Sequence, residues 1–239
     1  MGQNTVKSPE NKSGGKEKKQ PLLWKANKKG QHISGWLNFL RILILPLVRL
    51  FYPFRYYGDK NVKDGACLYV CNHYRMIDPM YMLPTTWEGI HFIGKKESFS
   101  MPILGWFCKK VRMIAVSRDG TDVRAVMDSL KCLKSGEKIA IFPEGTRNKS
   151  DVPFLPFASG AAVLAIRAKA PIVPVVIYEK AKLFKTTHVL IGEPFELSEY
   201  YGQKLTDELL KEADEKIKNA LVRMREEHAQ MLQSKKRKK

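Results

Sequence analysis

Cysteine is scarce in this 239-residue chain, and its placement excludes several kinds of site. The four cysteines show no C-x-x-C spacing: Cys67, Cys71, Cys108 and Cys132. Neither a zinc centre nor a dithiol redox motif can be assembled from them, and two of the four lie in one apolar run, which predicts packing in a reducing compartment. No repeat of about 20 to 50 residues is apparent either, so we expect one domain of moderate size.

The sequence also lacks the uninterrupted apolar run of about 20 residues that a membrane-spanning helix needs. Two arginines and two prolines interrupt the most lipophilic stretch, residues 33–54: Arg41, Pro46, Arg49 and Pro53. No small-residue cleavage site follows, which argues against a cleaved signal peptide. Acids are absent, and Arg41 and Arg49 lie eight residues apart, near one helical face. We therefore predict an amphipathic helical segment over residues 33–56 that lies in a membrane interface, with packing on the core as the alternative.

Acidic residues are few where basic residues gather. The formal net charge is +18, of which residues 1–32 carry +6, residues 33–57 carry +3 and residues 235–239 carry +5. Low apolar content predicts a disordered basic tail over residues 1–32, and a second basic tail covers residues 235–239. Such tails suit an anionic membrane surface or a nucleic acid. The lipophilic stretch that follows favours the membrane and no specific nucleic acid.

The chain does contain a polar pair behind a strand-like run. His73 and Asp78 follow the apolar residues 66–71, which predict a buried strand, and the carboxyl end of such a strand is where an α/β sheet binds ligands. A neutral imidazole there can take a proton from a hydroxyl, and a carboxylate on its other ring nitrogen fixes the tautomer. The pair has no nucleophile, so it suits direct attack by a substrate hydroxyl. Alone, the pattern also fits a loop histidine and a helix cap.

A second polar motif follows another strand-like run. Residues 142–147 read Phe-Pro-Glu-Gly-Thr-Arg and come directly after residues 138–141. Gly145 permits close backbone approach, Thr146 offers a hydroxyl and an N–H, and Arg147 offers a planar fork for a phosphate or carboxylate. Alone, this motif fits a strand-to-loop turn with a surface arginine. With His73 and Asp78 it indicates a reaction site.

Four motifs in order resemble the glycerophospholipid acyltransferase family over residues 58–195. They are N-H-x-x-x-x-D-P, G-K-K-E with a distal V-S-R, F-P-E-G-T-R and P-I-V-P-V. The chain is most similar to bacterial members that acylate 1-acylglycerol 3-phosphate to phosphatidic acid. The resemblance implies an α/β fold with a central mixed β-sheet flanked by helices, an acyltransferase domain over residues 57–234 and a membrane-associating helical segment before it.

The resemblance also implies a role for each residue of the motifs. His73 becomes the general base on the acceptor hydroxyl and Asp78 the residue that orients it. The implied substrate-binding residues come from the next two motifs: Lys95, Arg118, Glu144, Gly145, Thr146 and Arg147. Among these, the cations hold the acceptor's phosphate, Glu144 orders the loop or binds the glycerol, and backbone N–H groups near Gly145 stabilise the oxyanion. Pro174 belongs to a segment near the acyl chain.

The implied donor is an acyl thioester of coenzyme A or of acyl carrier protein, the acceptor is lysophosphatidic acid, and no metal or other cofactor is needed. The implied location is the cytoplasmic face of the cell membrane, with peripheral or monotopic attachment.

Three departures from the family pattern bear on the acceptor. Arg75 stands where a small hydroxyl residue is common and is a possible acceptor contact, Ile77 stands where an aromatic residue is frequent, and Ala158 and Ser159 replace the usual lysines. Glycerol 3-phosphate or a lyso-aminolipid is therefore the alternative acceptor. A non-catalytic basic protein that binds membranes is the alternative from another class.

Overall fold

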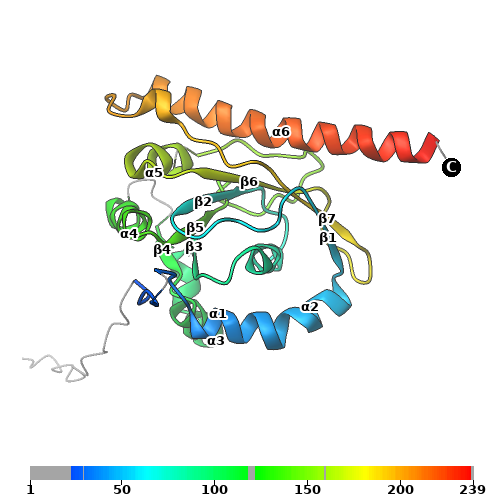
Figure 1. Ribbon diagram of the computed structural model, residues 1–239, viewed down its shortest axis with the longest axis horizontal. Helices are drawn as coiled ribbons and strands as arrows, with labels where there is room; N and C mark the ends of the chain where they lie inside the picture. Colours follow the sequence, from blue (N-terminus) through cyan, green and yellow to red (C-terminus); the bar gives the residue numbers. More distant parts are fainter. Residues whose placement is uncertain (1–22, 29, 118–121, 159, 238–239) are drawn as a thin grey trace, which may run out of the picture.

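The computed structural model describes residues 23–28, 30–117, 122–158 and 160–237. Within these residues, seven strands form one sheet in the order β1-β7-β6-β2-β5-β3-β4 (Figure 1). The strands are β1 (Phe54–Tyr57), β2 (Cys67–Cys71), β3 (Ile90–Lys95), β4 (Ile114–Val116), β5 (Lys138–Ile141), β6 (Ile172–Ile177) and β7 (Thr187–Ile191). Strands β2 to β6 run parallel, whereas β7 is antiparallel to β6 and carries β1 parallel to itself. The predicted mixed sheet is confirmed.

Helices cover both faces of this sheet. They are α1 (Gly35–Phe39), a π-helical turn (Leu40–Ile44), α2 (Leu45–Phe51), α3 (Pro102–Lys110), α4 (Val123–Lys134), α5 (Gly160–Ala168) and α6 (Asp207–Arg237). Four short 3-10 turns complete the list: Asp78–Tyr81, Leu83–Thr85, Lys96–Phe99 and Ser198–Tyr200. Figure 1 shows α5 and α6 on one side of the sheet, and α1, α2 and α3 on the other. None of the described helices combines the length and the apolarity needed to cross a bilayer.

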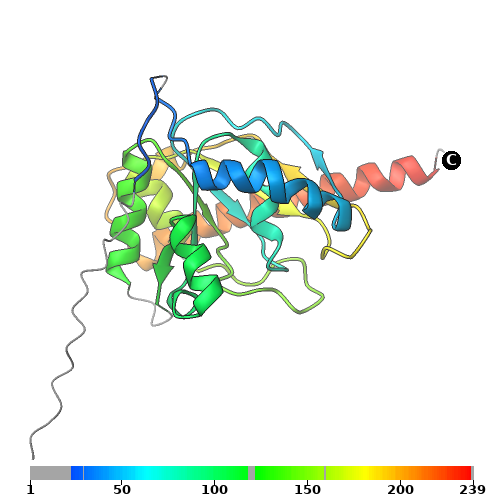
Figure 2. The ribbon, with the colours of Figure 1, turned by 90° about the horizontal axis from the view of Figure 1, so that it is seen from below.

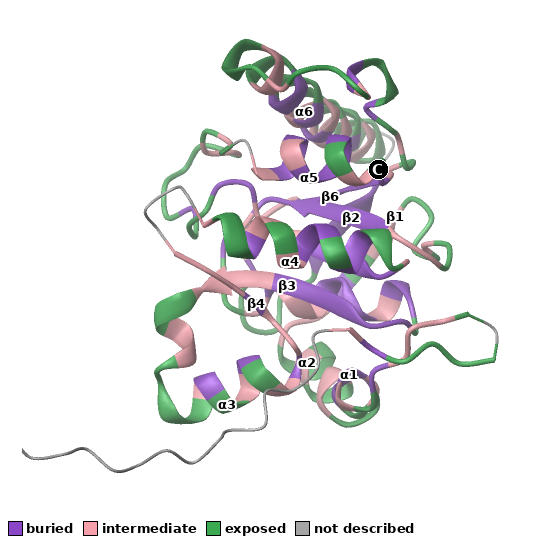
Figure 3. Ribbon diagram, turned by 90° about the vertical axis from the view of Figure 1, so that its left-hand side faces the viewer, coloured by how far each residue is buried: buried purple, intermediate pink, exposed green. Residues whose placement is uncertain are grey.

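Strand β2 shows why the core has two halves. All five of its residues are buried, and its side chains alternate between the two sheet faces. Leu68 and Val70 pack with α4, α5 and α6, whereas Tyr69 and Cys71 pack with the α1 side. Figure 3 shows this buried layer between exposed helical surfaces. A strand buried on both faces must be apolar throughout, which is why residues 66–71 could be recognised in the sequence.

The parallel strands bring the two polar motifs to one edge of the sheet. Strand β2 pairs with β5, Val70 standing opposite Ile141, so residues 72–78 and 142–147 leave the sheet side by side. Strand β3 pairs with the other side of β5 and ends at Lys95. We call this edge, where β2, β3, β5 and β6 end, the carboxyl edge. The sheet order therefore gathers motifs that lie far apart in the sequence.

Three predicted boundaries were wrong. The basic tail predicted for residues 1–32 extends too far, because Trp24 is buried and its ring lies 3.9 Å from that of His91; residues 1–22 lie outside the described part of the chain. The helical segment predicted to end at 56 ends at Phe51, because residues 54–57 pair with β7 as β1. The C-terminal helix continues to Arg237, so the tail predicted from residue 235 begins as helix.

Other details of the expected elements were also wrong. The prolines of the apolar run 171–177 predict a sheet edge or an irregular strand end, but Pro174 lies in β6, between β7 and β2, and its carbonyl accepts from the N–H of Gly192. Residues 79–83 begin with a proline, which predicts the start of a helix, whereas the structure has 3-10 turns at Asp78–Tyr81 and Leu83–Thr85. Arg41 does not sit on a lipid-facing surface with Arg49. It is buried, and its guanidinium donates to the carbonyls of Leu83, Trp87 and Glu88.

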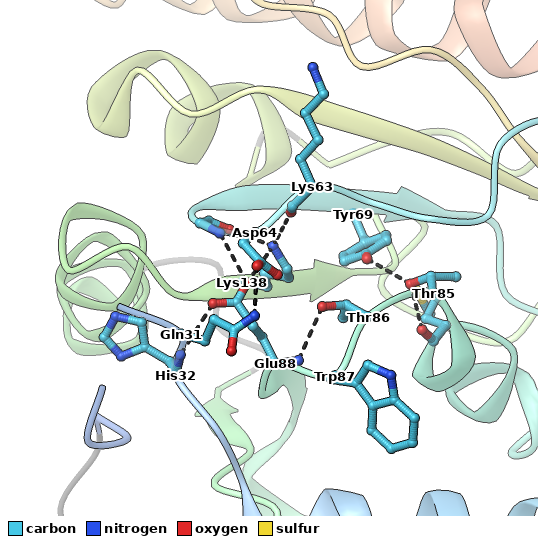
Figure 4. Close-up of polar contacts among 12 residues, drawn as sticks. Gln31, His32, Lys63, Asp64, Tyr69, Thr85, Thr86, Trp87, Glu88 and Lys138 are labelled. Carbon is cyan, nitrogen blue, oxygen red and sulfur yellow. Dashed lines mark hydrogen bonds and ion pairs between the residues drawn. The ribbon is translucent and has the colours of Figure 1, made fainter. Parts of the chain in front are cut away.

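A buried ion pair holds the opposite edge of the sheet together. The Lys138 ammonium lies 2.9 Å from a Glu88 carboxylate oxygen and donates to the carbonyls of Lys63 and Gly65 (Figure 4). The other oxygen of Glu88 accepts from the N–H of His32. The pair is almost fully shielded from water, so each charge depends on these contacts. They fix the loop before β2 and the N-terminal segment well away from the two polar motifs.

Candidate active site

The side chains of His73 and Asp78 meet at the carboxyl edge. His73 Nδ1 lies 2.9 Å from Asp78 Oδ2, and the same oxygen accepts from the N–H groups of Tyr74 at 2.6 Å and Arg75 at 2.7 Å. A tight loop makes this possible, because the 3-10 turn that starts at Asp78 folds its carboxylate back over the residues just before it. The contact that the spacing predicts is therefore present.

The geometry fixes the chemistry that this pair can perform. Asp78 is fully buried, so its charge is held by the two backbone N–H groups and the imidazole. When Nδ1 carries the proton that Asp78 accepts, Nε2 is left with a free lone pair. The His73 side chain is 17% exposed, so a substrate can reach it. The pair can act as a general base.

The loop after β5 packs directly on His73. The ring of Phe142 stacks on the imidazole, with centroids 4.1 Å apart, and the N–H of Asn148 donates to the carbonyl of His73 at 2.6 Å. Glu144 is buried, and one of its oxygens accepts from the N–H of His73 at 3.4 Å. Burial is the largest cause that raises the pKa of Glu144 to about 7, and the nearby charge of Asp78 adds to it.

Three residues of this loop face outward. Gly145 has a φ of +61°, and a Cβ placed there would meet no atom within 4 Å, so glycine serves the turn and keeps the surface beside His73 open. Thr146 and Arg147 are exposed. The loop that packs on His73 therefore carries an exposed hydroxyl, that of Thr146, and an exposed guanidinium, that of Arg147.

The remaining predicted site residues are spread more widely. Lys95 ends β3 at the same edge and is half-buried. Arg75 is exposed beside Asp78, which accepts from its N–H. Pro174 lies within β6, opposite Val70, and is buried in the sheet rather than open at the edge, so the structure does not bring it to the pair. Arg118 lies outside the described residues.

Sequence reasoning missed three residues that shape the site. Asn72 is fully buried, and its side-chain amide both donates to the carbonyl and accepts from the N–H of Ile177, joining the end of β2 to the end of β6. Phe142 and Asn148 hold His73 from the other side. Asn72 and Phe142 both belong to the sequence motifs. An asparagine directly after a buried strand could have predicted side-chain hydrogen bonds to the backbone of a neighbouring strand.

One buried group among the described residues has the composition of a metal site. His91, Cys132 and Glu137 each bring a ligand atom within 4.8 Å of the others. The contacts are those of a hydrogen-bond network, because both ring nitrogens of His91 face oxygens, those of Arg112 and Glu137, and Glu137 also accepts from the N–H of Trp24. This network lies at the start of β5, opposite the carboxyl edge.

Several known proteins are similar to this chain in sequence. The 1-acyl-sn-glycerol-3-phosphate acyltransferase of Bacillus subtilis is 30% identical over 60% of this chain and 74% of its own length. The chloroplastic enzyme BAT2 of Brassica napus is 32% identical over 72% of this chain, and the Helicobacter pylori enzyme is 33% identical over 51%. The chain spans only about half the length of these last two relatives, 52% of each.

A solved structure shares the fold. The 1-acyl-sn-glycerophosphate acyltransferase PlsC of Thermotoga maritima superposes with a TM-score of 0.55 and 23% identity, over 80% of this chain and 88% of PlsC. The family model named Acyltransferase matches residues 53–178, a range that contains both polar motifs and the strands that carry them. The chain belongs to the acyltransferase family.

Proposed function

We propose that this protein transfers an acyl group from a thioester to the 2-hydroxyl of 1-acyl-sn-glycerol 3-phosphate, which gives phosphatidic acid. The observation that carries the proposal is the contact between His73 and the buried Asp78 beside an open, cation-bearing loop. The relatives named as 1-acyl-sn-glycerol-3-phosphate acyltransferases support the choice of acceptor.

In this mechanism His73 Nε2 takes the proton of the acceptor hydroxyl as its oxygen attacks the thioester carbonyl carbon. The tetrahedral intermediate then collapses, the C–S bond breaks, and the imidazolium returns the proton to the thiolate. Asp78 keeps the imidazole in the reactive tautomer and stabilises its charge. The hydroxyl of the substrate is the nucleophile, so no covalent enzyme intermediate forms and neither a metal nor a redox cofactor is required.

The acceptor's phosphate is assigned to the cations around the pair. Arg147 lies on the loop that packs on His73, and Lys95 ends β3 at the same edge. The sequence motif of Arg118 supports the same role for this arginine. Arg75 is proposed as a further contact to the acceptor. A phosphate monoester carries nearly two negative charges, so several converging cations both bind it and orient its hydroxyl. Backbone N–H groups near Gly145 would stabilise the oxyanion, with Thr146 beside them.

We propose that the protein works at the cytoplasmic face of a membrane, attached without spanning it. Large apolar side chains lie exposed along α1, the π-helical turn and α2: Phe39, Ile42, Leu43, Leu47, Leu50 and Phe51. Figure 2 shows this helical segment lying across one face of the molecule. Exposed apolar rows of this kind mark contact surfaces, and a lipid interface suits a row that contains arginine and no acid.

Two other elements extend this apolar surface. Trp36 of α1 and Trp106 of α3 meet edge to face at 5.4 Å, with the Lys110 ammonium within 6 Å of both rings. At the far end of α2, the exposed Phe184 of the β6–β7 loop donates its N–H to the carbonyl of Phe51. Trp and Lys are the side chains that settle at headgroup depth. We refer to this surface as the apolar face.

The test of the reaction is acyl transfer to lysophosphatidic acid in mixed micelles, with acyl-coenzyme A and with acyl carrier protein as donors. We expect product from the wild type and a loss of at least about a hundredfold in His73→Ala, since general base catalysis contributes about that much. His32→Ala, which changes a histidine at the opposite edge, is the control. Near-normal transfer by folded His73→Ala would overturn the mechanism, and running glycerol 3-phosphate and a lyso-aminolipid alongside decides the acceptor.

A further inference from the structure

A pocket opens beside the His73–Asp78 pair at the carboxyl edge. It holds about 360 Å³ and lies between Tyr74, the loop around Ser150, the β6–β7 loop and helix α6. Tyr74, which lines the pocket, donates its N–H to Asp78, so the pocket wall is in direct contact with the pair. Concave sites of this size bind small molecules or parts of them. None of the residues that line it was assigned a role by the sequence motifs.

Four cations line this pocket. Three are the lysines of the β6–β7 loop, Lys180, Lys182 and Lys185, and the fourth is Arg225 of α6. Two acids also line it: Glu179, which accepts from the N–H of His188, and the exposed Asp151, whose carboxylate lies 3.9 Å from the Lys180 ammonium. The cations therefore outnumber the acids, which favours an anionic ligand.

Hydrogen bonds between the segments that line the pocket hold its walls in place. The Lys180 ammonium donates to the carbonyls of Lys149 and Ser150, at 3.2 Å and 2.8 Å, which holds the loop after Arg147 against the β6–β7 loop. Arg225 donates to the carbonyl of Tyr178 and lies over its ring, 4.4 Å from the centroid. The same walls continue to the catalytic pair, because the next residue back, Asn148, donates to His73.

We infer that this pocket binds the phosphorylated nucleotide end of an acyl-coenzyme A donor, an inference that rests on the proposed function. The nucleotide carries three phosphate groups, which need several converging cations. Its flexible pantetheine arm can run from the pocket past Tyr74 and deliver the thioester to His73. The acceptor's phosphate is held separately, on the Arg147 side. A small concave pocket suits a nucleotide better than the convex surface of a carrier protein.

The first experiment is calorimetric titration of the full-length protein, without lipid, with adenosine 3′,5′-bisphosphate. We expect binding to the wild type, weakened at least about tenfold in Lys182→Glu/Lys185→Glu, since two charge-assisted contacts are lost. Lys131→Glu/Lys134→Glu, with the same charge change on exposed positions of α4, should bind like the wild type. Equal weakening in both double variants would show general electrostatics and overturn the site. Glycerol 3-phosphate binding that depends on Lys182 and Lys185, without nucleotide binding, would assign the pocket to the lipid headgroup and overturn it too.

The second experiment separates this inference from the proposed function. In micelles, Lys182→Glu/Lys185→Glu should raise the KM for acyl-coenzyme A about tenfold and leave the KM for lysophosphatidic acid unchanged. If the wild type transfers from acyl carrier protein alone, and the double variant loses that activity, the pocket docks the carrier and the inference fails while the reaction stands. If no donor gives product, the proposed function fails, and the nucleotide titration still decides the pocket.

Discussion

Three histidines among the described residues contact a buried carboxylate, and two of them, His73 and His91, differ in what their surroundings allow them to do. His91 is fully buried, and its two ring nitrogens lie 2.9 Å from the carbonyl oxygen of Arg112 and 2.7 Å from a carboxylate oxygen of Glu137, so neither nitrogen is open to a substrate. His73 uses one nitrogen on Asp78 and keeps the other ring edge in a partly exposed position. The number of nitrogens already satisfied, more than the presence of the carboxylate, separates a structural pair from a reactive one.

Asp78→Asn should lower kcat by about a hundredfold to ten-thousandfold, because the amide no longer fixes the tautomer or stabilises the imidazolium. The fold should survive, since an amide oxygen can still accept from the N–H groups of Tyr74 and Arg75. The measurement is kcat with both substrates saturating, and circular dichroism checks folding. Asp128→Asn, at a part-exposed aspartate of α4 that lines neither the pair nor the pocket, serves as the control. A kcat equal to that of the control would remove Asp78 from the mechanism.

Glu144→Gln should change how stability depends on pH. Burial raises the pKa of Glu144 from 4.5 to about 7, so the folded state binds this proton more tightly than the unfolded state. Its contribution to stability is fully present below pH 4.5 and is lost as the pH rises through about 7. The glutamine variant has no proton to lose at this position. The urea concentration at its unfolding midpoint, minus that of the wild type, should therefore increase from pH 5 to pH 8.

The control for this measurement is Glu226→Gln, at an exposed glutamate of α6. Its midpoint should keep a constant offset from the wild type at every pH. A constant offset for Glu144→Gln as well would show that Glu144 is ionised in the folded protein throughout this range. Acyl transfer by the variant then separates the two roles proposed for Glu144, since loop ordering tolerates the amide better than glycerol binding through a carboxylate.

Much of the candidate site could be predicted from single residues, because its members follow strands that are apolar throughout. That His73, Asp78 and the loop from Glu144 to Arg147 meet follows from the expectation that parallel strands end at one edge, whereas their roles came from the family resemblance. The stacking of Phe142 on His73 could not be predicted, because it depends on which strands are neighbours. Sheet order is a tertiary property that local patterns do not encode.

At the scale of elements, the helical segment before β1 was expected, but its register was not. Its arginines were expected to share one face, yet the π-helical turn Leu40–Ile44 rotates the chain, and Arg41 points into the body while Arg49 stays exposed. Burial lowers the pKa of Arg41 to about 10, so it remains charged at neutral pH. Its contacts with the carbonyls of Leu83, Trp87 and Glu88 fasten the segment to the domain.

Leu47→Glu/Leu50→Glu should weaken binding to lipid vesicles by at least about tenfold, because the variant no longer buries two leucine side chains in the bilayer. Both side chains are more than half exposed, so the fold should tolerate the change. Sedimentation with phosphatidylcholine vesicles measures the bound fraction. Val123→Glu/Met127→Glu, at equally exposed apolar positions of α4, should bind like the wild type. If the α4 variant lost as much binding, the apolar face would have no special part in attachment.

At the scale of the whole molecule, the carboxyl edge of the sheet differs from the opposite edge, where the parallel strands begin. The edge at the start of β5 is closed by the Lys138–Glu88 pair and by the His91 network, which fasten the N-terminal segment. The carboxyl edge has exposed loops and carries the His73–Asp78 pair. The apolar face and the carboxyl edge share the β6–β7 loop, whose Phe184 contacts Phe51 and whose Lys182 lines the pocket. The proposed reaction, with its lipid acceptor, needs such proximity.

Charge should act on attachment separately from the apolar face. Residues 1–22 carry five lysines against two glutamates, and residues 235–239 carry five basic residues, together +8 of the net +18. Each basic residue near an anionic bilayer contributes about 1 kcal/mol, and salt screens it. Removing both segments should weaken binding to phosphatidylglycerol vesicles at least about tenfold and flatten its salt dependence.

Binding to neutral phosphatidylcholine vesicles, and acyl transfer in micelles, should stay as in the intact chain, since both depend on the folded domain. An unchanged salt dependence would place the electrostatic contact on the domain itself, and loss of transfer in micelles would show that the ends serve the reaction directly.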